Sequence, residues 1–324
     1  MCNFFVVFWS NILKIMFVEQ GSKRKNEFWR YLVGSLLIAT ASFVGQIPIS
    51  VAILIKSFKN GSMPTKNSDV MHYFEPNLQL FLLLLTFVFA FAALYFVVTR
   101  YHEQTFLSVT TSRKSVDWSR VLFSFGLWAT VSIGLTLYGY YSDPSHFQIN
   151  FKPLPFAILC VIAILMIPIQ TSTEEYLFRG YLMQGFANLS KNKWFPLLMT
   201  SVLFGSLHIL NPEIEKLGYI VLIYYIGTGF LLGIITLMDE GMELALGFHA
   251  ANNLVGALLI TTDWGALQTN SIFIDRSQPN VGAEILVPIF ILYPLLIFVF
   301  SKKYRWKNWN DKLTGKINTL EFKN

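Results

Sequence analysis

The sequence predicts an all-α, polytopic membrane helix bundle with about eight transmembrane helices and both termini in the cytoplasm. Of its 324 residues, 54% are hydrophobic and 14% are charged, whereas soluble domains carry about a quarter charged residues. The mean hydropathy is +0.50. Apolar stretches long enough to cross about 30 Å of hydrocarbon recur along the whole chain. These observations exclude an ordinary soluble domain.

The apolar stretches are separated by short polar loops, so no appended soluble domain is expected. The expected spans are residues 31–55, 78–98, 121–141, 154–170, 194–210, 217–238, 243–262 and 285–300. Short cytoplasmic loops carry an excess of Lys and Arg. With the N-terminus inside, 19 of the 25 Lys and Arg residues fall on the cytoplasmic pieces. This bias supports eight spans.

We therefore divide the chain into an N-terminal interfacial or cytoplasmic segment (1–30), a transmembrane helical domain (31–300) and a basic cytoplasmic tail (301–324). The basic clusters at residues 23–25 and in the tail lie beside apolar spans, where positive charges are attracted to anionic headgroups. We interpret them as orientation signals, and we expect no nucleic-acid partner.

The first apolar stretch, residues 3–18, lacks a basic n-region and a small-residue cleavage site, so a cleaved signal peptide is not expected. It is either an interfacial helix or sequence upstream of the true start, with Met16 as the initiator. The two cysteines, Cys2 and Cys160, form neither a metal cluster nor a disulfide framework.

Ionisable side chains inside membrane helices are costly and usually face a cavity or a partner, so they indicate function. They are concentrated in the second half of the chain, within residues 154–262. The candidates are Glu174, Glu175, Arg179, His208 and His249, together with the polar amides Asn252 and Asn253. Any chemistry is therefore expected in this part of the protein.

Helical spacing sorts these groups, because residues four apart share a helix face. Glu175 can reach Arg179, whereas Glu174 points about 100° away around the helix axis and lacks a local cation. By the same rule His249 and Asn253 share a face, and so do Phe204 and His208. We expect Glu175 and Arg179 to be structural, because the cation lets a carboxylate remain in a poorly hydrated place.

The course of the helix that carries the two glutamates is open at this point. Ser172 followed three residues later by Glu175 has the form of a capping box, so a helix can start near Thr173 after a break at Pro168. In that interpretation the glutamates cap a helix at an interface.

Alternatively, the helix continues to about Leu189. Glu174 then lies about 22 Å from the cytoplasmic end at 1.5 Å per residue. His208 lies at a similar depth, about 21 Å along a helix that begins near Trp194. The two side chains can meet, and tilt can bring His249 to the same level.

A carboxylate beside a histidine can hold a water molecule and remove its proton, the general-base step of peptide hydrolysis. A second histidine and an asparagine amide can donate hydrogen bonds to the developing oxyanion. No nucleophilic serine or cysteine motif accompanies the set, so water is the expected nucleophile. Glu174, His208 and His249 would also suffice as a zinc shell with water in the open position. Because HExxH spacing is absent, we favour chemistry without a cofactor over zinc.

Three motifs in order, EExxxR (Glu174 to Arg179), FxxxH (Phe204 to His208) and HxxxN (His249 to Asn253), resemble those of the CPBP intramembrane proteases. That family includes eukaryotic CAAX prenyl proteases and bacterial relatives linked to bacteriocin processing and self-immunity, often called Abi. The resemblance covers about residues 154–262. It implies an eight-helix α-fold with a cavity inside the membrane.

Carried onto this sequence, the resemblance implies that Glu174 activates water with His208, while His249 and Asn253 stabilise the oxyanion. It implies an intramembrane endopeptidase whose substrate is a membrane-associated protein or peptide. The short loops and the absence of a CaaX or KDEL terminus favour a bacterial cytoplasmic membrane. Two alternatives are a non-enzymatic immunity or scaffold protein and a proton-coupled transporter. The transporter is disfavoured because the polar groups occupy only one half of the chain.

Overall fold

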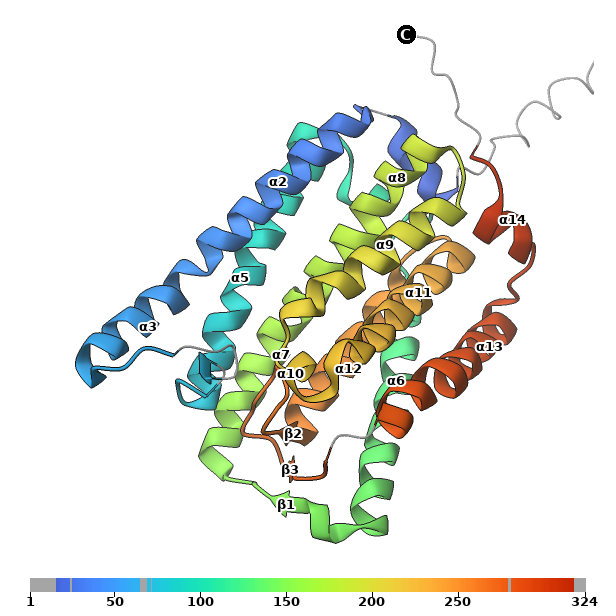
Figure 1. The fold of residues 1–324 in the computed structure, drawn as a ribbon. Helices are drawn as coiled ribbons and strands as arrows, with labels where there is room; N and C mark the ends of the chain where they lie inside the picture. Colours follow the sequence, from blue (N-terminus) through green and yellow to red (C-terminus); the bar gives the residue numbers. More distant parts are fainter. Residues whose placement is uncertain (1–15, 24, 65–68, 71, 279–280, 318–324) are drawn as a thin grey trace, which may run out of the picture.

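The computed structural model describes residues 16–23, 25–64, 69–70, 72–278 and 281–317, and it is a bundle of long helices (Figure 1). The possible interfacial helix near the N-terminus falls largely on residues 1–15, outside the described residues. The α-helices are α2 (Phe28–Gly45), α3 (Ile47–Asn60), α5 (Pro76–Phe96), α6 (Trp118–Ser142), α7 (Pro153–Glu175), α8 (Met183–Ser190), α9 (Trp194–Ser206), α10 (Glu213–Leu217), α11 (Val221–Asp239), α12 (Glu243–Leu259), α13 (Tyr293–Tyr304) and α14 (Trp309–Thr314).

Several of these helices are joined or extended by tighter or wider turns. The 3₁₀ turns are Phe17–Lys23, Phe106–Val109, Pro144–His146, Leu207–Leu210 and Gly218–Ile220. The π-helical turns are Val97–Tyr101, Tyr176–Leu182, Gly282–Leu286 and Pro288–Leu292. The strands are β1 (Phe147–Ile149), β2 (Ile260–Thr262) and β3 (Phe273–Asp275).

Among the described residues, five helical stretches are long and apolar enough to cross a membrane by length and composition. They are Phe28–Lys59, Pro76–Tyr101, Trp118–Ser142, Pro153–Ser190 and Glu213–Asp239, with a shorter apolar helix at Trp194–Leu210. The other two predicted spans, 243–262 and 285–300, coincide with α12 and with the π-helical turns that lead into α13 together with most of α13. The structure thus confirms an all-α, polytopic membrane bundle. The predicted end of the fourth span at residue 170 is too early, because the helix continues to Ser190.

A three-stranded sheet, which the all-α prediction did not include, lies in the loops at one end of the bundle (Figure 1). Its order is β1-β3-β2, with β1 antiparallel and β2 parallel to β3. Phe147 pairs with Asp275, and Ile260 pairs with Phe273. Each strand has three residues, so the sheet ties loops together without changing the fold class.

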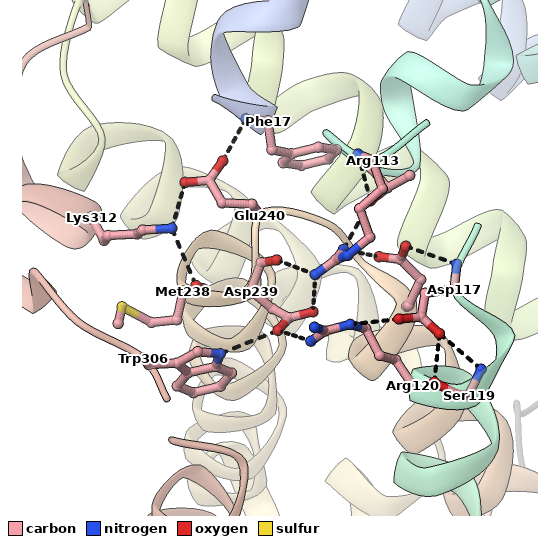
Figure 2. A network of polar contacts seen from close by, with 12 residues as sticks. Phe17, Arg113, Asp117, Ser119, Arg120, Met238, Asp239, Glu240, Trp306 and Lys312 are labelled. Atoms are coloured by element: carbon pink, nitrogen blue, oxygen red, sulfur yellow. Dashed lines mark hydrogen bonds and ion pairs between the residues drawn. The ribbon is translucent and has the colours of Figure 1, made fainter. Parts of the chain in front are cut away.

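Four of the segments predicted to be cytoplasmic, within residues 1–30, 99–120, 239–242 and 301–324, meet away from the sheet (Figure 1). They surround the acidic turn at Asp239 and Glu240 (Figure 2). Arg113 donates to the Asp239 carboxylate at 2.9 Å, and Arg120 pairs with its other oxygen. Lys312 and the backbone N–H of Phe17 donate to Glu240, each at 2.7 Å. The acidic turn therefore accepts hydrogen bonds from basic side chains of the neighbouring segments. The contacts are consistent with a common side for these segments.

Two buried apolar clusters hold the helices around the candidate site. One joins α6, α11, α12 and α13 and includes Trp128 and Phe248. The other joins α5, α7 and α12 and includes Ile167. Large apolar side chains also remain on outer helix faces, such as Phe43 at 69% and Leu165 at 63% exposure. Such surfaces are stable against lipid but costly in water.

Candidate active site

The two glutamates lie in the last turn of α7, and the helix continues directly into the π-helical turn that carries Arg179. Pro168 lies inside α7 without ending it, so the capping-box interpretation is wrong. The physical reason is burial: Thr171 and Thr173 are packed inside the bundle and donate their hydroxyls to carbonyls of the preceding turn. Polar residues satisfied in this way do not end a helix. π-Helical turns inside α-helices are frequent at functional sites.

Glu175 and Arg179 form a fully buried ion pair, as their spacing predicts. Arg179 Nη1 lies 3.0 Å from Glu175 Oε1, and both side chains are 0% exposed. The same carboxylate oxygen accepts a hydrogen bond from His249 Nδ1 at 2.7 Å. Because a carboxylate only accepts, the proton on this face of the ring is on Nδ1. Glu175 therefore orients His249 and also balances the charge of Arg179.

Glu174 points away from that pair and remains 16% exposed. Its Oε1 accepts a hydrogen bond from Gln170 Nε2 at 2.7 Å. Its Oε2 lies 3.5 Å from His249 Nε2. One oxygen of Glu174 is thus held by an amide, and the other faces the imidazole. A water molecule bound there would contact both groups.

His208 follows α9 in a 3₁₀ turn, and its ring packs between Phe204 and Tyr225. Its Nδ1 donates to the Phe204 carbonyl at 2.8 Å, which leaves Nε2 available as an acceptor. The ring stacks on Tyr225 with centroids 4.0 Å apart. Among the described residues no direct hydrogen bond links His208 to Glu174, so a bridging water would be needed.

Asn253 lies one turn after His249 on α12, as expected from the HxxxN spacing. Its Nδ2 donates to Gln170 Oε1 at 3.1 Å, and its Oδ1 accepts from Asn252 Nδ2 at 3.0 Å. Asn252 Oδ1 in turn accepts from the indole of Trp128 at 3.1 Å. The structure thus brings Glu174, His249 and Asn253 together through Gln170 and direct contact.

Phe204 is also part of this cluster. Its ring lies 4.4 Å from the guanidinium carbon of Arg179, in cation–π geometry. Its centroid lies 5.0 Å from that of His208 and 6.0 Å from that of His249. Phe204 therefore contacts the arginine and both imidazoles.

Sequence reasoning missed the partners Gln170, Tyr225 and Trp128. Gln170 could have been found, because it precedes Glu174 by four residues, the same spacing that identified the ion pair. Tyr225 and Trp128 lie on α11 and α6. Neither helix carries a recognised motif, and no spacing within one helix connects them to the site.

A cavity of about 580 Å³ lies near the sheet and is lined by Glu75, Lys152, Thr261 and Arg276, among others. None of the four proposed catalytic residues lines it. Buried apolar side chains of α5, α7 and α12 form a cluster between these helices. This cavity is therefore not the active-site cavity that the family resemblance implies.

The zinc alternative requires Glu174, His208 and His249 to converge on one ion. Within the part of the chain that the structure describes, no group of three His, Cys, Asp or Glu side chains is arranged to hold a metal. Nδ1 of each imidazole donates to an oxygen, an arrangement that also holds metal-ligating histidines, and His249 Nε2 lies 3.5 Å from the Glu174 carboxylate. The zinc alternative therefore stays a prediction.

The fold and the cluster define a polytopic membrane protein with carboxylates, imidazoles and an amide gathered between its helices. Residues 153–255 match the family model described as type II CAAX prenyl endopeptidase Rce1-like. This match confirms the resemblance to the CAAX proteases over that segment. It supports a membrane-embedded protease of the CAAX type. All four proposed catalytic residues lie inside the matched segment.

A curated protein from Bacillus subtilis (strain 168), called uncharacterized protein YyaK, is 28% identical to the chain over 291 residues. The alignment covers 87% of this chain and 95% of that protein. The similarity therefore extends well beyond the motif segment. No solved structure matches the chain.

Proposed function

We propose that this protein is an intramembrane endopeptidase in which Glu174 and His208 activate a water molecule and His249 and Asn253 stabilise the oxyanion. The observation that carries the proposal is the contrast between the two adjacent carboxylates. Glu175 is fully buried and accepts two hydrogen bonds on one oxygen, whereas Glu174 Oε2 accepts none from the described residues and lies beside His249. We therefore assign Glu174 Oε2 as the general base that removes the proton from water.

In this mechanism water binds between Glu174 Oε2 and His208 Nε2. The carboxylate removes a proton as the water oxygen attacks the scissile carbonyl carbon. The carbonyl π electrons move to oxygen, and the oxyanion accepts hydrogen bonds from the second N–H of Asn253 and from His249 Nε2–H. In this role His249 carries a proton on each nitrogen. Collapse of the intermediate breaks the C–N bond, and Glu174 returns the proton to the leaving amine.

For the substrate we propose a membrane-associated protein or peptide, cut at a bond that can reach the bilayer interior from the cytoplasmic side. The Lys and Arg distribution and the depth of Glu174 in α7 support this placement. The bacterial cytoplasmic membrane is the proposed location. The similarity to a Bacillus protein supports it.

The test is mass spectrometry of membrane-protein termini in cells that carry either the wild-type protein or Glu174→Gln. Termini that depend on Glu174 should disappear in Glu174→Gln and in His208→Ala, while both variants still insert. Glu215→Gln, at an exposed glutamate of α10, is the matched control and should keep every terminus. Unchanged termini in Glu174→Gln would reject the assignment.

Chelation distinguishes the two hydrolytic mechanisms. On the proposed mechanism, cleavage by the purified protein continues in the presence of a zinc chelator. Loss of cleavage that is restored by added zinc would instead favour a metal-dependent reaction.

A further inference from the structure

Gln170, Asn253, Asn252 and Trp128 link three helices through consecutive hydrogen bonds that end on Glu174. Asn252 and Asn253 are adjacent on α12, so their side chains point about 100° apart. One meets Trp128 on α6, and the other meets Gln170 on α7. Trp128 is 6% exposed and Gln170 is 8% exposed. In such a poorly hydrated place, each polar group depends on its neighbour in the chain.

The two ends of this series of hydrogen bonds determine the direction of donation along it. An indole N–H can only donate, so Asn252 must present its oxygen to Trp128 and its NH₂ to Asn253. Asn253 must then present its own oxygen to Asn252 and its NH₂ to Gln170. At the other end, an ionised Glu174 can only accept, so Gln170 must present its NH₂ to that carboxylate. Each amide therefore has one orientation that satisfies both neighbours.

This direction of donation determines which atoms of Asn253 and Glu174 remain available at the proposed active site. Asn253 uses one N–H for Gln170 Oε1 and keeps its second N–H available. Glu174 uses Oε1 for Gln170 and keeps Oε2 on the side of His249. If Asn253 were rotated by 180° about its amide, its oxygen would face Gln170 Oε1, and it could no longer donate there.

We infer that Trp128, Asn252 and Gln170 are positioning residues that set the amide orientation of Asn253 and the carboxylate rotamer of Glu174. The catalytic part of this inference rests on the proposed function. The directed series of hydrogen bonds does not rest on the proposed function, because it depends only on the donor and acceptor chemistry of the four side chains. Consecutive hydrogen bonds polarise one another, so a substitution at Gln170 should change the hydrogen bond that the Trp128 indole donates.

The first test uses no substrate. The indole ¹⁵N–H signals of the purified protein are recorded by NMR for the wild type, Gln170→Leu and Asn252→Leu, and Trp128→Phe assigns the Trp128 signal. The Trp128 signal should move in Gln170→Leu, because the two side chains are connected through Asn252 and Asn253. The signal of exposed Trp118 on α6 should stay in place. A Trp128 signal that is unchanged in Gln170→Leu would overturn the proposed series of consecutive hydrogen bonds.

The second test measures cleavage of the membrane protein whose new terminus depends on Glu174. Misplaced catalytic groups cost up to about 100-fold in rate, so kcat should fall about 10- to 100-fold in Trp128→Phe and Gln170→Leu while KM changes less than about threefold. Trp118→Phe is the control and should match the wild type. A wild-type kcat in Trp128→Phe would overturn the positioning role.

The two tests separate the two proposals. If no terminus depends on Glu174 but the Trp128 signal moves in Gln170→Leu, the proposed function fails and the directed series of hydrogen bonds stands. In that case the positioning role in catalysis is also rejected.

Discussion

Removing Arg179 should leave a buried carboxylate without its cation, and the cost can be worked out from the geometry. Arg179 and Glu175 are both 0% exposed, with 3.0 Å between Nη1 and Oε1. Breaking a buried ion pair on one side costs about 3–5 kcal/mol, because the remaining charge stays buried. His249 Nδ1 still donates to Glu175 at 2.7 Å and offsets part of the loss. We therefore expect Arg179→Met to destabilise the protein by about 3 kcal/mol, at the low end of that range.

The assay is reversible unfolding of the purified protein in mixed micelles, arranged as a double-mutant cycle. Glu175→Gln/Arg179→Met removes both charges, so it should cost clearly less than the sum of the single variants. Arg276→Met is the matched control. Arg276 pairs with Asp263 at 2.6 Å, but both side chains are 51% exposed. An exposed pair contributes about 0–1 kcal/mol.

Two results would contradict this reasoning. One is an Arg179→Met variant no less stable than Arg276→Met. The other is a double variant whose cost equals the sum of the single costs, since this would mean that the two side chains do not interact.

Two further predictions concern the packing of α9 against α11 and the cytoplasmic side. A Cβ on Gly229 would lie 2.7 Å from the Ser201 carbonyl oxygen, so Gly229→Ala should cost about 1–3 kcal/mol by overpacking. Gly126→Ala, where nothing lies within 4 Å, should be neutral or stabilising in the same unfolding assay; equal effects would refute the packing argument. Burial lowers the pKa of His102, which contacts Tyr181 and lies beyond the end of its span. The unfolded state therefore binds more protons, and thermal stability should fall as pH decreases below about 6.5. His102→Gln should weaken this dependence, and an unchanged slope would exclude His102 as its source.

The spacing of residues along a single helix made one contact of the candidate site predictable from the sequence. The Glu175–Arg179 pair follows from residues four apart sharing a face, and the structure confirms it. The hydrogen bond from His249 to Glu175 joins residues 74 positions apart in the sequence, so no periodicity could indicate it. The sequence therefore identified the pair as structural but could not show that it also orients a proposed catalytic histidine.

The fold was predictable to a similar extent. Hydropathy found the apolar spans because the bilayer imposes one length on each of them. It misplaced the end of the span at residue 170, where the polar run from Gln170 to Glu175 lowers the hydropathy. Those side chains are satisfied by neighbouring helices, and a hydropathy window cannot detect partners that come from elsewhere in the chain. The strands near Phe147 and Phe273 were missed for a related reason, since three-residue strands carry no usable alternation.

The environments of the two adjacent glutamates explain why one sequence motif can supply both a support and a base. Glu175 is 0% exposed and accepts hydrogen bonds from an arginine and an imidazole, so its position is fixed. Glu174 is 16% exposed, and only one of its oxygens is held, by the neutral amide of Gln170. Paired titratable groups whose surroundings differ in this way take different chemical roles. On the proposed mechanism, exchanging the two environments would remove the reactive carboxylate even though both glutamates remained. The surroundings, more than the EE dipeptide, therefore define the proposed active site.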